Sequence, residues 1–332
     1  MGQKRIVGVS AILIATTCFG FLGLFNRFLQ NDFGLASIDV TFVRLSVASI
    51  VLLIVLAIFA PKTLHITLKD IPYIILFAVF KLLSDLFLFN AQTTTSLSLA
   101  TLLQMTSPYF IMIFSFLIFK ERITAKKFIA AIVASIGCVL VTHVVTGHLS
   151  LDAAGILSGI MSGLCYGLFL LGNKVYYDRG MNPAASLFYT FAFASVMILP
   201  FIHFEPLGNA FTDVTGLGAC IVFGIILTLV PFYLLAISLR YLEPTTVSVL
   251  GVMELVASTM VGFFFFNEVL EPIDIGGILL VIAAIFIINA EIFLWFRKKY
   301  GEYRHVPDKP EKEHSDTYTM GRTLDEDIRN RK

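Results

Sequence analysis

Long apolar runs separated by short polar breaks constrain this chain more than any other feature. A helix needs roughly 20 apolar residues to cross a hydrocarbon core about 30 Å thick. Runs of that length predict ten spans, at residues 6–29, 38–60, 71–92, 97–119, 125–147, 153–177, 184–204, 215–239, 245–267 and 273–296. Helix-boundary signals such as Asn182-Pro183 and Glu243-Pro244 stand in the breaks. The sequence therefore predicts an all-α integral membrane protein with ten transmembrane helices.

The composition argues against a soluble protein. Hydrophobic residues make up 57% of the chain and charged residues 14%, whereas soluble proteins have about 25% charged residues. The net charge of +1 gives no reason to expect a nucleic-acid partner. The four cysteines lie inside apolar runs without CxxC or zinc-site spacing, so they are interpreted as small buried hydrophobes. No cofactor or metal is predicted.

The two ends of the chain and the basic residues predict an orientation. Lys4 and Arg5 precede the run 6–29, which is longer than the apolar region of about 7–15 residues in a signal peptide, so we expect a retained helix after an N-terminus of residues 1–5. Residues 297–332 are polar and are expected to form a disordered tail. Basic residues gather in every second loop, which predicts cytoplasmic N- and C-termini in the cell membrane.

Short motifs of the first half recur in the second half. The pairs are Cys18-Phe19-Gly20 with Cys165-Tyr166-Gly167, Asn26-Arg27 with Asn173-Lys174, and Glu121 with Glu268, and each pair is separated by 147 positions. This register predicts two repeats, at 6–147 and 148–296, with five helices each. Because five is odd, the two copies would enter the membrane in opposite senses. Such inverted repeats allow a midplane site to open alternately to either side.

These residues resemble the EamA family of the drug/metabolite transporter superfamily over about residues 7–290. The resemblance is carried by Phe19-Gly20 and Tyr166-Gly167, where family members usually have Trp-Gly, and by Arg44, Pro108, Glu121, Glu268 and Glu254. Leu255 stands where the family has a proline after that glutamate. The resemblance implies secondary transport, often export of amino acids or other metabolites.

Four ionisable residues stand out within the predicted spans, because an ionisable residue there costs several kcal/mol unless it is paired or hydrated. Lys81 and Asp85 have the spacing of an ion pair within one helix, which is either structural or a site for a zwitterionic substrate. The positions that match them in the second repeat are Thr228 and Phe232, and this asymmetry favours a substrate site. Glu254 and Asp85 are candidate proton-coupling groups, because burial favours the neutral form of a carboxyl. Arg44 is interpreted as structural.

Neutral polar residues extend the predicted substrate site, although hydrogen bonding between helices would also explain each of them. They are Gln92, Gln104, Tyr166 and Tyr233, and they join Lys81, Asp85 and Glu254 as predicted substrate-binding residues. Pro108 is expected to kink its helix and free a carbonyl. Asn26 and Asn173 are expected to cap or tie the first helix of each repeat, and Glu121 and Glu268 are assigned structural roles.

The sequence favours a transporter over an enzyme, because GxxxxGK[ST], HExxH and GxSxG motifs are all absent. We expect a secondary transporter that moves a small polar metabolite by alternating access, with an amino acid-like substrate and export favoured. Its expected partners are that substrate and the lipid bilayer. Two alternatives stay open, a non-transporting membrane sensor or assembly factor that keeps the fold and an intramembrane enzyme.

Overall fold

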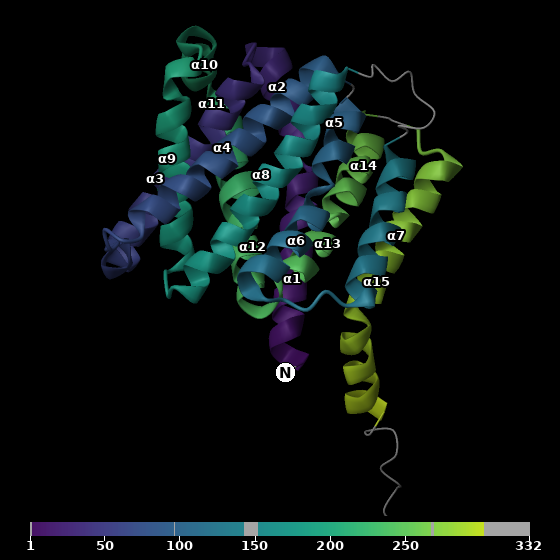
Figure 1. Ribbon diagram of the computed structural model, residues 1–332. Coiled ribbons are helices and arrows are strands. Elements are labelled where there is room, and N and C mark those ends of the chain that lie inside the picture. The colour runs from purple at the N-terminus through teal and green to yellow at the C-terminus, as the bar shows by residue number, and fades with distance from the viewer. Residues whose placement is uncertain (1, 96, 143–151, 267–268, 302–332) are drawn as a thin grey trace, which may run out of the picture. The chain divides into compact units, whose positions relative to one another are not determined.

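The computed structural model describes residues 2–95, 97–142, 152–266 and 269–301, and every regular element in this part of the chain is a helix (Figure 1). The chain divides into a unit of residues 1–292 and a second unit of residues 293–332. All packing below lies within the first unit. Glu268, residues 143–147 of the fifth predicted span and residues 302–332 of the predicted tail lie outside the described residues.

Each predicted span contains helical structure, and several are interrupted. The first half of the chain forms α1 (Gly2–Gly20), α2 (Leu22–Phe33), α3 (Ser37–Phe59), η1 (Pro61–Leu64), α4 (Ile71–Thr94), α5 (Leu97–Gln104), α6 (Ser107–Phe119) and α7 (Ala125–Val141). The second half forms α8 (Ala153–Asp178), α9 (Pro183–Ile198), η2 (Leu199–Phe201), α10 (Phe204–Thr212), α11 (Val214–Gly224), η3 (Ile225–Leu229), α12 (Val230–Tyr241), α13 (Pro244–Gly251), α14 (Met253–Phe266) and α15 (Pro272–Gly301).

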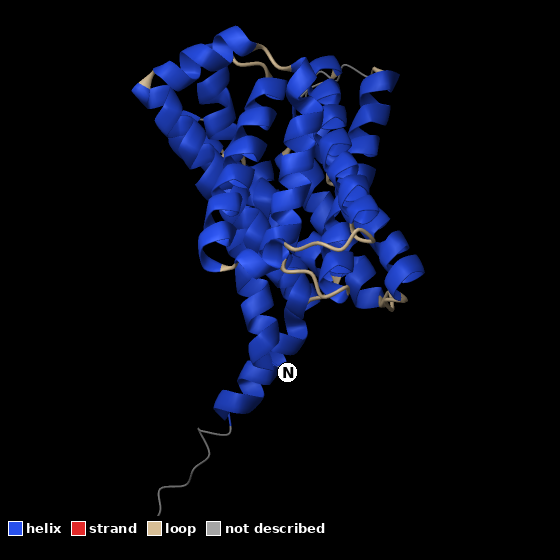
Figure 2. Cartoon of the chain, turned by 90° about the vertical axis from the view of Figure 1, so that its left-hand side faces the viewer, coloured by secondary structure: helices blue, strands red, loops and turns tan. Residues whose placement is uncertain are grey.

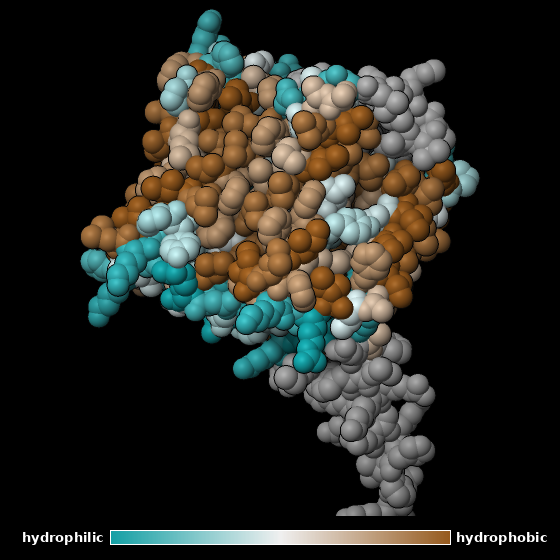
Figure 3. All heavy atoms as spheres, viewed as in Figure 1, coloured by the Kyte–Doolittle hydropathy of each residue, from teal (hydrophilic) through white to brown (hydrophobic). Residues whose placement is uncertain are grey.

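Among the described residues, nine helical segments are long and apolar enough to cross a membrane. The described part of the fifth predicted span is α7, which has 17 residues and ends before the undescribed stretch. Hydrophobic residues cover the middle of the face seen in Figure 3, and hydrophilic residues gather toward its ends. Large hydrophobic side chains such as Phe116, Phe201 and Phe286 are exposed on the surface of the protein. The protein is therefore a multi-pass membrane protein.

Several helices differ from the prediction. The first predicted span, 6–29, is two helices that continue to Phe33, because a turn at Phe21 divides it. The last helix, α15, continues to Gly301 rather than ending at 296. The short helix α10 was not predicted, since nine residues with mixed polarity give too weak a pattern against the long spans around it.

Helices of the two halves pack against each other in matching pairs. The second-half helix α8 packs on α4, and the first-half helix α1 packs on α12. Likewise α5 and α6 pack on α8, as α13 and α14 pack on α1. The views in Figures 1 and 2 show these helices running between two ends at which the loops gather. In the 147-residue register α1 matches α8, and α4 matches the segment that contains α12. The two pairs are therefore equivalent contacts of the two halves.

The two aromatic-glycine motifs explain one matching contact. A Cβ added at Gly20 would lie 2.8 Å from the backbone of both Ala257 and Ser258 in α14. A Cβ added at Gly167 would lie 3.1 Å from Ile111 in α6, which matches α14 in the register. Glycine therefore lets α1 approach α14 closely and α8 approach α6 closely, as small residues do between helices of membrane proteins.

Gly20→Ala should lower the free energy of unfolding by about 1–3 kcal/mol, because the added methyl group would force α1 and α14 apart. Gly23→Ala is the matched control, since a Cβ at Gly23 would meet nothing within 4 Å, and alanine is the better helix former. Thermal unfolding of both variants in detergent measures the difference. Equal midpoints for the two variants would contradict this account of the motif.

Candidate functional site

Three helix interruptions meet at one cavity of about 110 Å³. Phe19 and Leu22 flank the α1–α2 break, Gln104, Met105 and Ser107 flank the α5–α6 break, and Gly251 and Glu254 flank the α13–α14 break. The other residues that line the cavity are Ile12, Thr16, Arg44, Lys81, Asp85, Leu88, Tyr166, Leu170, Phe232, Leu235, Val247 and Ser248. Irregular backbone at membrane depth is tolerated where it is buried in protein or lines a cavity.

Local sequence explains one of these interruptions and is consistent with a π-helical turn elsewhere in the second half. Pro108 occupies the first turn of α6, and because proline has no N–H, the helical bond back to the carbonyl of Gln104 cannot form. Pro231 stands just after the π-helical turn η3, which also lacks an ordinary helical ladder. At the third break, Leu255 keeps the N–H that a proline would lack and donates it to the carbonyl of Val252 at 3.0 Å.

The carboxylate of Asp85 is shared by two cations. Its Oδ2 lies 2.5 Å from Nζ of Lys81, one turn earlier in α4, and 2.8 Å from Nη2 of Arg44 in α3. Lys81 is 2% exposed, so its charge depends on this contact. Arg44 therefore lines the cavity and ties α3 to α4. A cation that approached Asp85 from the cavity would meet two positive charges already there.

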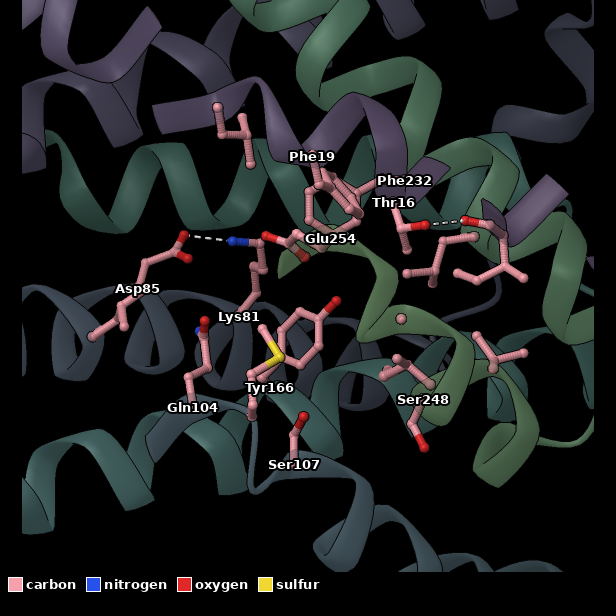
Figure 4. Close-up of a pocket in the computed structure, with 18 of the residues that line it drawn as sticks. Thr16, Phe19, Lys81, Asp85, Gln104, Ser107, Tyr166, Phe232, Ser248 and Glu254 are labelled. Atoms are coloured by element: carbon pink, nitrogen blue, oxygen red, sulfur yellow. Dashed lines mark hydrogen bonds and ion pairs between the residues drawn. The ribbon is translucent and has the colours of Figure 1, made fainter. Parts of the chain in front are cut away.

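Glu254 is held differently. It lies in the first turn of α14, and among the described residues no side chain or backbone group forms a hydrogen bond or ion pair with its carboxylate. The positive charge of Arg44 acts on Glu254 through space. The N-terminal end of a helix also favours a negative charge. Figure 4 shows Glu254 between the aromatic pair Phe19 and Phe232 and the ring of Tyr166.

Aromatic rings form the apolar part of the cavity. The ring centroids of Phe19 and Phe232 are 4.9 Å apart, and Nζ of Lys81 lies 5.5 Å from the centroid of Phe232. Phe232 is the second-half residue that matches Asp85 in the 147-residue register. Its ring contacts Lys81, the cation that pairs with Asp85 in the first half. Sequence reasoning did not place Phe232, Thr16, Ser107 or Ser248 in a site, although Ser107 adjoins the Pro108 break that it had recognised.

The seven residues predicted to bind substrate separate into two groups. Lys81, Asp85, Gln104, Tyr166 and Glu254 line the cavity, whereas Gln92 and Tyr233 do not. Gln92 is half-buried near the end of α4. Tyr233 is 39% exposed, because it follows Phe232 by one residue and so points about 100° away around α12. Gln104 also donates to Ser162 in α8 at 3.1 Å, which fixes its amide at the cavity wall.

The residues assigned structural roles make local contacts. Asn26 accepts a hydrogen bond from Gln30, and Asn173 donates to the carbonyl of Phe169, so both bond within their own helix. Glu121 accepts from Nζ of Lys127 at 2.9 Å. The same Nζ lies 2.5 Å from Glu243, which immediately precedes α13. Lys127 thus connects the α6–α7 loop of the first half to the α12–α13 loop of the second.

A helical bundle whose interrupted helices enclose a cavity with charges of both signs is the architecture of a membrane transporter. The model of the EamA-like transporter family matches the chain twice, over residues 6–143 and 153–290, and the chain belongs to this family. This confirms the resemblance seen in the sequence. The two matched ranges also begin 147 positions apart, in the register of the repeated motifs.

Relatives and a solved structure agree with this assignment. An uncharacterized transporter of Archaeoglobus fulgidus is 26% identical over 84% of this chain and 95% of its own length. The uncharacterized transporter YwfM of Bacillus subtilis is 24% identical over 71% of this chain and 79% of its own length. One crystal structure has the same fold, with a TM-score of 0.72 and 16% identity over 88% of this chain and 98% of that one.

Asp85→Asn should lower the free energy of unfolding by about 3–5 kcal/mol, because Arg44 and Lys81 would lose their shared counter-charge inside the protein. Glu254→Gln is the matched control. It also removes a carboxylate charge, but that carboxylate has no direct ion-pair partner among the described residues. Thermal unfolding in detergent should show a clearly lower midpoint for Asp85→Asn than for Glu254→Gln. The reverse order would mean that the cations do not depend on Asp85.

Proposed function

We propose that the protein is a secondary transporter that moves a small polar metabolite across the cell membrane by alternating access. The observation that carries this proposal is the cavity at which three interrupted helices meet, since it brings two cations and two carboxylates together inside the membrane-spanning unit. Buried charges of both signs suit a polar substrate, with an amino acid-like one favoured. Export is the direction that the family resemblance implies.

The architecture proposed for this mechanism is ten transmembrane helices in two inverted five-helix repeats, 6–147 and 148–296. The matching packing of α4 on α8 and of α12 on α1 supports it, and α7 would be the tenth spanning helix. The distribution of basic residues supports cytoplasmic termini, with residues 297–332 as a cytoplasmic tail. Glu254 and Asp85 are the carboxyls proposed to couple transport to protons.

Flux into liposomes tests the function directly. The purified protein should release preloaded L-amino acids saturably, and Lys81→Met with Asp85→Asn should abolish that flux because both charges line the cavity. Runs with and without a pH gradient test the coupling, which Glu254→Gln should remove. Saturable flux that survives in the double variant would exclude the Lys81–Asp85 site. Ligand binding without any flux would favour the sensor alternative, and turnover without a gradient would favour the enzyme.

The Lys127 contacts are proposed to close the cavity on the side of the chain's N-terminus. Lys127 joins Glu121 of one repeat to Glu243 of the other, directly before the cavity-lining helix α13. Alternating access requires such a bridge to break when that side opens. Lys174 offers a comparison, because its ion pair with Asp178 stays within α8.

Lys127→Met should therefore speed labelling of Ser248→Cys by a membrane-impermeant maleimide several-fold from the N-terminal side. The measurement uses a background without the four native cysteines, so that only the cavity position reacts. Lys174→Met is the control and should leave the rate unchanged. Equal rates in the two lysine variants would show that the bridge does not hold this side closed.

A further inference from the structure

The charges of the cavity are divided unequally between the two halves of the chain. Arg44, Lys81 and Asp85 come from the first half, where two cations share one carboxylate oxygen. Glu254 comes from the second half and has no direct counter-ion among the described residues. With these groups ionised, the first half presents a net positive charge to the cavity and the second half a negative one. The cavity as a whole is neutral, but it is polarised.

Space for a ligand lies beside the free carboxylate. Gly251 lies three residues before Glu254, on the other side of the α13–α14 break, and also lines the cavity. A Cβ built at Gly251 would meet nothing within 4 Å, so the wall is open there. Tyr166 and Phe232 face the same space (Figure 4). Aromatic faces attract cations, so an ammonium at Glu254 would find both a counter-charge and suitable neighbours.

The excess positive charge of Arg44 and Lys81 suits a ligand carboxylate. Asp85 cannot neutralise both Arg44 and Lys81, and a guanidinium has further N–H donors beyond the one at Asp85. A ligand carboxylate can complete that cluster, whereas a ligand ammonium there would be repelled. The sequence alone suggested Asp85 as the ammonium partner, and the shared contact with two cations makes Glu254 the better one.

We propose that Glu254 binds the ammonium of a zwitterionic ligand while Arg44 and Lys81 bind its carboxylate, so that the ligand bridges the two halves. This assignment rests on the proposed transport function, because it uses the same cavity. It makes Glu254 and the Arg44–Lys81 pair the residues that determine specificity. It also gives binding a direct effect on conformation, since a bound zwitterion draws oppositely charged halves together.

Thermal shift on the purified full-length protein tests this assignment without transport. The probes are single L-amino acids, their N-acetyl derivatives and their methyl esters. At least one free amino acid should raise the unfolding midpoint, and both of its derivatives should lose the effect because each lacks one charge. Glu254→Gln should weaken binding by about tenfold or more, as expected for the loss of a charge-assisted contact.

Two further variants keep the result interpretable. Glu205→Gln makes the same change on exposed α10, outside the cavity, and should bind as the wild type does. Gly251→Val fills the open wall without changing any charge and should also abolish binding. A ligand-free melt of each variant shows whether it is folded. If Glu254→Gln fails to fold, Gly251→Val and the derivatives decide the question.

The outcomes separate this assignment from the transport function. Equal binding of methyl esters, unchanged binding by Glu254→Gln, or no binding of any free amino acid would overturn the assignment. Saturable flux of another solute in liposomes would then leave the transport function standing. Conversely, amino acid binding that depends on Glu254 but produces no flux would support the assignment and overturn transport.

Discussion

Backbone groups inside a bilayer must find partners within the protein, and this constraint accounts for where the cavity lies. The breaks between α1 and α2, α5 and α6, and α13 and α14 leave carbonyl and N–H groups outside the helical ladder. In contact with lipid, each such group would cost several kcal/mol. All three breaks instead face one cavity, which is lined by both charged and apolar side chains. The interruptions therefore lie inside the protein, away from contact with lipid.

The charges obey the same constraint in a different way. Lys81 is buried within a largely apolar core that includes Phe19, Phe169 and Phe232. It keeps a counter-charge because Asp85 lies one turn away on the same helix, and Arg44 enters from α3 to share it. One carboxylate cannot neutralise two cations, so one positive charge is left over within the first half. The remaining carboxylate, Glu254, lines the same cavity and has no direct counter-ion among the described residues.

Sequence reasoning located some of this site for identifiable reasons. The pairing of Lys81 with Asp85 follows from spacing along one helix, and Pro108 marks a break because it lacks an N–H. The contact of Arg44 with Asp85 joins different helices, so no spacing rule predicts it. Tyr233 was placed in the site and Phe232 was not. Adjacent residues of a helix point about 100° apart, so of these two only Phe232 faces the cavity.

The sequence by itself determined that the chain resides in a membrane, roughly where its helices begin and end, and that its halves repeat with a period of 147 residues. These properties depend on local composition and spacing, which need no knowledge of packing. Only the tertiary structure decided which charges meet. Electrostatic pairing depends on interatomic distance and on burial, and both are set by how each helix is rotated and interrupted against its neighbours. Asp85 is therefore held by two cations, while Glu254 has no direct counter-ion among the described residues.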